Sequence, residues 1–215
     1  MRRTADVVVL EPAKKLGRPK IRSDEEQYEI ILSQAMEIFL ESGFIATRMD
    51  DLASTCKISK RTLYRFFPSK LDLFTALVQA HRSSMVDFPP ELDGLSLEAA
   101  LLQVFRVELD PTEDFRRMLF VQRTLVDARL VPELGDILHN EGGEQAKLRL
   151  AEWLTARKCR EQIGSGDPYH LAAMLMDLVF GAIALKPATN SYWPGGSDRK
   201  TYLQDCIRFF VNGIR

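Results

Sequence analysis

Cationic and hydroxyl-bearing side chains gather in one short stretch of the chain, residues 59–65. An arginine carries a planar guanidinium whose donors match the two acceptors of guanine in the DNA major groove, and the methyl group of threonine can contact thymine. We therefore expect Lys60, Arg61 and Thr62 to contact the edges of bases. The alternative interpretation is a solvated cationic helix face beside a tyrosine, Tyr64, that packs in the core.

Contacts to phosphate groups are expected from residues around this stretch. The first turn of a helix presents unpaired backbone amides to an anion, and hydroxyl groups and cations placed there add hydrogen bonds. The residues expected to hold phosphates are Thr47, Arg48, Ser59, Tyr64 and Lys70. Because phosphate contacts carry no sequence information, this set is expected to position the protein on DNA rather than to select a site.

The elements that must position these side chains follow from the hydrophobic spacing. From Asp24 onward, apolar residues recur at the three- and four-residue spacing of an amphipathic helix. These residues are Ile31, Ala35, Ile38 and Phe39. Ser23 or Asp24 can cap the first amides of this helix, and Gly43 supplies permissive backbone just beyond its last turn.

A helix-turn-helix is expected next along the chain. A short helix opens at Thr47, residues 56–58 separate it from the next helix, and Ser59 caps that third helix. Two short helices across a three-residue turn, the second rich in cations, are typical of DNA-binding proteins. Leu63 and Phe67 are expected to anchor the third helix to the first helix and to a fourth.

The remainder of the chain also has helical patterns, separated by proline, glycine or both. The expected helices span residues 96–109, 112–130, 132–158, 168–185 and 197–214. No segment alternates apolar and polar residues with β-branched enrichment, so the fold class predicted is all-α, with about nine helices in total. The predicted organisation is a flexible basic arm (1–23), a helix-turn-helix domain with its connecting fourth helix (24–88) and a larger helical domain (89–215).

Charge is distributed unevenly along the chain. The first 22 residues hold seven cations and two carboxylates, so they carry +5, and the remaining residues carry −6 within a net charge of −1. This asymmetry is typical of a chain that touches a polyanion at one end. Residues 16–20 look like the core of an AT-hook, which predicts that Arg18 and Lys20 contact an A·T-rich minor groove. The alternative is an unstructured tail that adds only diffuse attraction.

The ordered set of residues between about 31 and 77 resembles the DNA-binding domain of the tetracycline-repressor (TetR) family. The matching residues are Ala35, Phe39, Gly43, Phe44, Thr47, Met49, Asp50, Asp51, Leu52, Ala53, Ile58, Ser59, Thr62, Leu63, Tyr64, Phe67, Lys70, Leu73 and Phe74. Relatives usually have glycine in the turn where this chain has Lys57. A positive φ there would strain Lys57 by about 1 kcal/mol, which a phosphate contact can offset. A second departure is Phe66, at a site where relatives often carry histidine.

The resemblance implies the partners of the protein. It implies a homodimer on a palindromic operator in double-stranded DNA, joined through the last two helices, because one helix-turn-helix contacts only a few base pairs. It also implies release by a small-molecule effector that binds between the middle helices, with the fourth helix passing the change to the DNA-reading heads, and repression is the family-level expectation. Candidate lining residues are mostly apolar, which favours an apolar effector: Phe105, Met118, Gln122, Trp153, Met174 and Phe180.

Other classes of protein are less favoured. His81, His139 and His170 lie on separate segments without metal-ligand spacing, and we expect no enzyme activity, metal or cofactor. Two alternatives stay open: an architectural DNA protein without an effector, and a regulator controlled by a protein partner. The three cysteines lack paired spacing, and no apolar stretch has the length that a bilayer requires, so a cytoplasmic protein without a membrane segment is expected.

Overall fold

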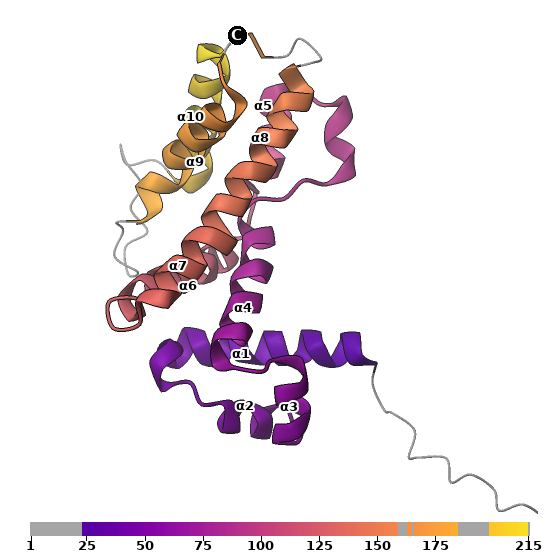
Figure 1. Cartoon of the computed structure of the whole chain (residues 1–215). Coiled ribbons are helices and arrows are strands. Elements are labelled where there is room, and N and C mark those ends of the chain that lie inside the picture. Colours follow the sequence, from indigo (N-terminus) through magenta and orange to yellow (C-terminus); the bar gives the residue numbers. More distant parts are fainter. Residues whose placement is uncertain (1–22, 159–162, 165, 185–197, 215) are drawn as a thin grey trace, which may run out of the picture.

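The structure of the chain is a computed structural model that describes residues 23–158, 163–164, 166–184 and 198–214. Every regular element in these ranges is helical and none is a strand, which confirms the predicted all-α class. The helices form two stacked parts, and one helix runs from the first part toward the second (Figure 1).

The first part contains the helix-turn-helix. Its helices are α1 (Asp24–Ala46), α2 (Met49–Thr55), α3 (Lys60–Phe66) and α4 (Lys70–Met85). In Figure 1, α1 lies across the molecule with α2 and α3 below it, and α4 leaves toward the second part. Ser23 caps α1 in a capping box with Glu26. Near the other end of α1 the chain bends at Gly43, whose φ of 79° is a conformation that glycine adopts without strain.

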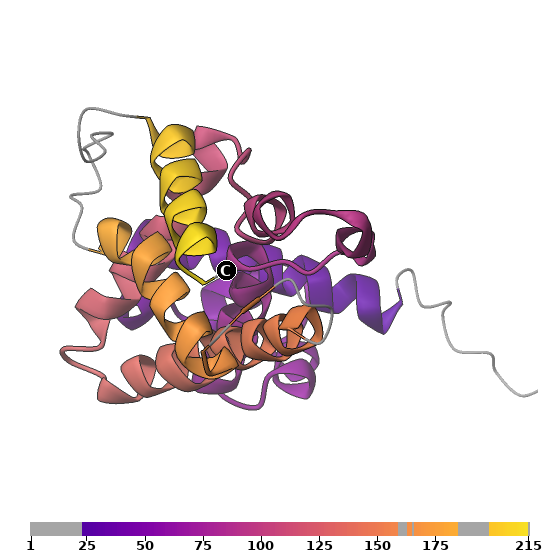
Figure 2. The same ribbon diagram turned by 90° about the horizontal axis from the view of Figure 1, so that it is seen from above.

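The second part is built from the remaining elements. These are a 3₁₀ turn, η1 (Pro90–Gly94), then α5 (Leu97–Val104), α6 (Pro111–Asp127), α7 (Pro132–Ile137), a π-helix, η2 (Leu138–Glu144), α8 (Gln145–Lys158), α9 (Pro168–Ala184) and α10 (Arg199–Gly213). Since α7, η2 and α8 follow one another without a break, they correspond to the single helix predicted for residues 132–158. Figure 2 shows α9 and α10 side by side at one edge of this part. None of the helices in the described ranges is long and apolar enough to cross a membrane.

Two predicted helix limits are wrong. The helix expected for residues 96–109 ends at Val104, because Arg106 takes a φ of 50°, a left-handed conformation that interrupts a right-handed helix. The second helix begins at Met49 rather than at Thr47, with Arg48 as an N-cap whose side chain makes no capping hydrogen bond. The Thr47 hydroxyl instead donates to the Gly43 carbonyl oxygen at 2.7 Å, so Thr47 closes α1.

Two hydrophobic cores hold the two parts. The C-terminal core is formed by residues of η1, α5, α8, α9 and α10 together with neighbouring loops. The N-terminal core joins α1–α4 and also includes Phe120 from α6 and Leu134 from α7. The centroid of the Phe120 ring lies 5.1 Å from the ring centroid of Phe39 and 6.0 Å from that of Phe74. The apolar interior of the first part therefore extends into the second part.

Candidate nucleic-acid interface

The third helix has the construction that a DNA-reading helix requires. Ser59 caps α3, with its hydroxyl oxygen accepting from the Thr62 backbone amide at 3.0 Å. Leu63 and Phe67 are buried and pin the inner face of α3, as predicted. Lys60 and Arg61, on the first turn, are exposed. The first turn of α3 is therefore free to enter a groove while its opposite face is fixed.

The two cations on this turn differ in their surroundings. The Lys60 ammonium lies 2.7 Å from the Asp50 carboxylate on α2, and the hydrogen bond and the charge of Asp50 raise the pKa of Lys60. Arg61 has no ion-pair partner within the described ranges. Arg61 can therefore reach a base without first leaving a carboxylate, whereas Lys60 must exchange Asp50 for DNA. The sequence contains no signal for this pairing between α2 and α3.

Around α3, three of the expected phosphate contacts are accessible. Arg48 and Lys57 are exposed at the two ends of α2, and Tyr64 is 45 % exposed on α3 rather than packed in the core. Lys57 has a φ of 55°, the condition under which its side chain is strained at this turn. The hydroxyl groups of Ser59 and Thr62 lie 2.8 Å apart, so these two side chains share a hydrogen bond on the same surface.

Thr47 and Lys70 are placed differently from the prediction. The Thr47 side chain is buried and its hydroxyl proton is used within α1, so the structure does not support a phosphate contact from that group. Lys70 is half-buried: its ammonium donates to the Ile45 carbonyl oxygen at 3.2 Å and lies 4.3 Å from the centre of the Phe44 ring. Burial lowers the pKa of Lys70. The predicted arm contacts, Arg18 and Lys20, lie outside the described residues.

The helix-turn-helix part, α1–α4, is attached to the second part toward both ends of α6. Near the start of α6, Arg116 forms an ion pair with Glu37 of α1. At its end, the Asp127 carboxylate accepts a hydrogen bond from the Phe44 backbone amide at 2.6 Å. These two contacts join α6 directly to α1.

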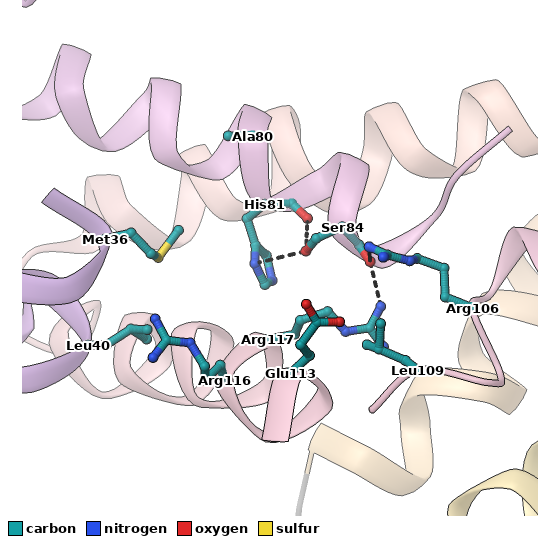
Figure 3. Close-up of a pocket in the computed structure, with 10 residues that line it drawn as sticks. All are labelled: Met36, Leu40, Ala80, His81, Ser84, Arg106, Leu109, Glu113, Arg116 and Arg117. Carbon is teal, nitrogen blue, oxygen red and sulfur yellow. Dashed lines mark hydrogen bonds between the residues drawn. The ribbon is translucent and has the colours of Figure 1, made fainter. Parts of the chain in front are cut away.

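A pocket lies where α1, α4 and α6 meet, and it has a volume of about 270 Å³ (Figure 3). We call it the junction pocket, and it is lined by Met36, Leu40, Ala80, His81, Ser84, Arg106, Leu109, Glu113, Arg116 and Arg117. Figure 3 shows the imidazole of His81 projecting from α4 toward α6, and Arg106 extending toward Ser84. Three guanidinium groups and one carboxylate, that of Glu113, therefore border one small pocket.

Buried polar groups line the inner wall of the junction pocket. Arg117 is 5 % exposed and donates to Asp114 at 2.8 Å and to the carbonyl oxygen of Ser84. Arg199 of α10 lies 2.9 Å from the other carboxylate oxygen of Asp114. His81 is 7 % exposed; burial, and to a smaller extent the charge of Arg117, lower its pKa to about 3, so the imidazole is neutral.

The residues expected to line an effector cavity occupy other places. None of Phe105, Met118, Gln122, Trp153, Met174 and Phe180 borders the junction pocket. Phe105 is fully buried in the C-terminal core, where its ring meets that of Phe180 edge-on at 5.8 Å. Met118 and Trp153 pack half-buried against the same core, whereas Met174 is 62 % exposed. Sequence reasoning missed the junction pocket because its cations come from segments whose proximity only the folded chain reveals.

The fold and this surface define a helix-turn-helix DNA-binding protein with a second helical part. Residues 31–77 match the family model described as bacterial regulatory proteins, tetR family. These residues therefore form a DNA-binding domain of the TetR family.

Similar proteins agree with this assignment along most of the chain. The transcriptional activator FasR of Mycolicibacterium smegmatis is 23% identical over 203 residues, which cover 91% of this chain and 85% of FasR. The transcriptional regulator RutR of Escherichia coli is 29% identical over 168 residues, 72% of each chain. The solved structure of the flavonoid-responsive regulator FrrA is 28% identical, with a TM-score of 0.61 over 89% of this chain and 98% of that one. A TetR-family regulator from Rhodococcus sp. shares the fold, with a TM-score of 0.68 at 17% identity over 87% of this chain and 99% of that one. The chain is thus a DNA-binding transcription regulator and not an enzyme.

Proposed function

We propose that two copies of the chain bind a palindromic operator as a homodimer, repress transcription and leave the operator when a small effector binds the sensor part. The observation that carries this proposal is the exposed first turn of α3, with Lys60 and Arg61 directed away from the core. Arg61 reads a guanine, Lys60 and Thr62 contact neighbouring bases, and the exposed Arg48, Lys57 and Tyr64, with Ser59, hold the flanking phosphates.

The homodimer forms through α9 and α10. Apolar residues remain exposed on both helices, with Met174 62 % exposed on α9 and Phe209 79 % exposed on α10. These two helices lie next to each other, so a second copy can cover both (Figure 2). Sedimentation of the full chain at micromolar concentration is expected to give a dimer, and Phe209→Glu is expected to shift it toward monomer. A stable monomer of the unaltered chain would contradict this arrangement.

The effector acts on the spacing of the two reading heads. We propose that the apolar body of the effector binds a mostly apolar set of residues in the second part: Phe105, Met118, Gln122, Trp153, Met174 and Phe180. Binding of effector and of operator oppose each other through a coupling free energy of about 1–3 kcal/mol. One similar protein, FasR, is named an activator, so activation is the second candidate for the outcome of DNA binding.

The reading assignment is tested with two arginine substitutions that remove equal charge. Arg61→Ala is expected to weaken operator binding by about 1–3 kcal/mol and to relax the preference at one base pair. Arg48→Ala is expected to weaken binding to all sequences alike and to reduce the salt dependence by about one phosphate contact. Affinities are measured by fluorescence anisotropy over a salt series and a set of operators with single base changes. If both variants behave identically across the operator set, Arg61 does not read a base.

The basic arm adds a minor-groove contact through Arg18 and Lys20. Deletion of residues 1–22 is expected to reduce affinity and the slope of affinity against salt. Preference for A·T pairs at the operator flanks should fall as well, because the minor groove there is narrow and strongly negative. An unchanged affinity and slope would remove the arm from the proposed interface. An architectural protein without an effector, or one controlled by a protein partner, would show no release by any small molecule.

A further inference from the structure

We propose that the junction pocket binds a small monocarboxylate whose apolar body carries a hydroxyl group. Three features of the pocket support this class of ligand: a guanidinium without a carboxylate partner, a buried acceptor without a donor, and an apolar wall. Binding at this site follows from these features alone. Its effect on DNA rests on the proposed function.

Positive charge exceeds negative charge around the pocket. The lining residues and their ion-pair partners comprise four guanidiniums, Arg106, Arg116, Arg117 and Arg199, and three carboxylates, Glu37, Glu113 and Asp114. Within the described ranges Arg106 has no carboxylate at ion-pair distance, and its guanidinium reaches only the Ser84 carbonyl oxygen at 3.5 Å. One monovalent anion balances this set, and a guanidinium holds a carboxylate through two parallel hydrogen bonds. The geometry therefore favours one carboxylate at Arg106.

The second feature is the imidazole of His81. The Ser84 hydroxyl donates its proton to the His81 carbonyl oxygen at 2.6 Å, so it meets Nδ1, at 3.5 Å, with an oxygen lone pair. This arrangement places the imidazole proton on Nδ1 and leaves Nε2 as an acceptor. Nε2 is buried and has no hydrogen-bond partner among the described residues. Because an unsatisfied buried acceptor is unfavourable, a ligand hydroxyl that donates to Nε2 gains free energy.

The third feature is the opposite wall of the pocket. Met36 and Leu40 from α1, Ala80 from α4 and Leu109 after α5 line it with apolar atoms. A volume of about 270 Å³ lies near the lower limit of small-molecule pockets. The wall and the volume fit an apolar body the size of one aromatic ring.

The site lies between α1, α4 and α6, so a bound ligand contacts both the DNA-binding part and the sensor part. A ligand held by Arg106 and by His81 ties the segment after α5 to α4. If the proposed function holds, such a ligand changes operator affinity, and operator changes ligand affinity by the same factor.

The test is calorimetric titration of the full chain without DNA, with benzoate, the three hydroxybenzoate isomers and 4-hydroxybenzamide as probes. We expect benzoate to bind, at least one hydroxybenzoate to bind several-fold more tightly, and the uncharged amide to bind at least tenfold more weakly than 4-hydroxybenzoate. Arg106→Gln should weaken every carboxylate at least tenfold. Arg129→Gln removes the same charge from an exposed position outside the pocket and should leave affinity unchanged. His81→Phe keeps a ring beside Phe120 and should abolish the preference for the hydroxylated probe.

Each outcome decides one part of the proposal. Absence of binding by all carboxylates at millimolar concentration overturns it, as does equal affinity of Arg106→Gln and Arg129→Gln. Equal affinity for 4-hydroxybenzamide and 4-hydroxybenzoate would show that the pocket does not recognise the negative charge. Binding of carboxylates as expected, with the operator affinity measured by anisotropy unchanged, would support the ligand site. That result would contradict the proposal that a ligand bound there releases DNA.

Discussion

The backbone amide of Phe44 donates to the carboxylate of Asp127 across 83 positions of sequence, at a distance of 2.6 Å. This hydrogen bond joins the bend at the end of α1 to the last residue of α6. The neighbouring Gly43 leaves room for it, because a Cβ at that position would lie 2.9 Å from the same carboxylate. The helix-turn-helix part and the second part are thus linked by a charge-assisted hydrogen bond.

Asp127→Ala is expected to lower the free energy of unfolding by about 1–2 kcal/mol, because a partly buried backbone amide loses its acceptor. Asp127→Asn keeps an acceptor oxygen and should lose less. Urea titration measures both, with Asp136→Ala on the exposed face of α7 as the control. A loss for Asp127→Ala no greater than that of the control would mean that this link does not contribute to stability.

Lys57→Gly is expected to raise the free energy of unfolding by about 1 kcal/mol, because glycine adopts a φ of 55° without the steric strain of a side chain. Lys57→Ala removes the same charge but keeps a Cβ, so it should not gain stability. Both variants should bind DNA more weakly, by similar factors, since each loses one cation at the turn. Equal stability of the two variants would show that the turn is not strained.

Asp50→Asn is expected to strengthen binding to DNA several-fold at low salt, because Lys60 no longer has to leave a carboxylate 2.7 Å away. Asp51→Asn is the matched control: it removes an equal charge from the next residue of the same exposed turn. Stability should change little, since the pair is exposed to solvent. Anisotropy measured between 50 and 200 mM salt compares the variants. The same gain for both would assign the effect to net charge rather than to release of Lys60.

His81 is expected to make the protein less stable as pH falls. Its pKa is about 3 in the folded chain, against an ordinary value of 6.5, so the unfolded chain binds the proton first. The contribution is complete above pH 6.5 and is lost as pH falls from 6.5 toward 3, by at most about 1.4 kcal/mol per pH unit. Arg117, Arg116 and Arg106 also face this pocket and stay charged in that range. The Glu113 carboxylate lines the pocket as well, so the effect of His81 is taken from the difference between the unaltered chain and a variant that keeps Glu113.

The measurement for His81 is the free energy of unfolding by urea at several pH values. His81→Asn should flatten the dependence between pH 6.5 and pH 4. His139→Gln, at an exposed position of η2, should leave the dependence as it is in the unaltered chain. A pH dependence unaltered by His81→Asn would show that this imidazole is not protonated on unfolding.

The reading helix could be predicted from the sequence because its determinants are local. These determinants all lie within about ten residues of one another. They are the helix cap Ser59, the buried side chains of Leu63 and Phe67, and the turn at Lys57, where relatives usually have glycine. The end of α5 could not be predicted in this way, because the left-handed conformation of Arg106 has no local signal. Arg106 is held there by the fold: its carbonyl oxygen accepts from Arg199, 93 residues away.

The junction pocket was beyond sequence reasoning for a related reason. Its residues come from α1, α4, the segment after α5, and α6, which are scattered between Met36 and Arg117. Helical periodicity predicts which side of each helix is buried, but not which helices meet. The same limit explains Thr47 and Lys70, whose polar groups both donate to carbonyl oxygens near the end of α1.

The participation of Phe120 and Leu134 in the N-terminal core has a consequence for building hybrid regulators. The predicted boundary after residue 88 separates segments of the chain, yet the apolar interior crosses it. A chimera that joins residues 24–88 to the sensor of a relative must also carry the inner surface of α6. Without it, the rings of Phe39 and Phe74 would face a foreign side chain or water. The folding of such a chimera, and with it the operator specificity that it carries, will therefore depend on how well α6 and α7 pack against the grafted α1–α4.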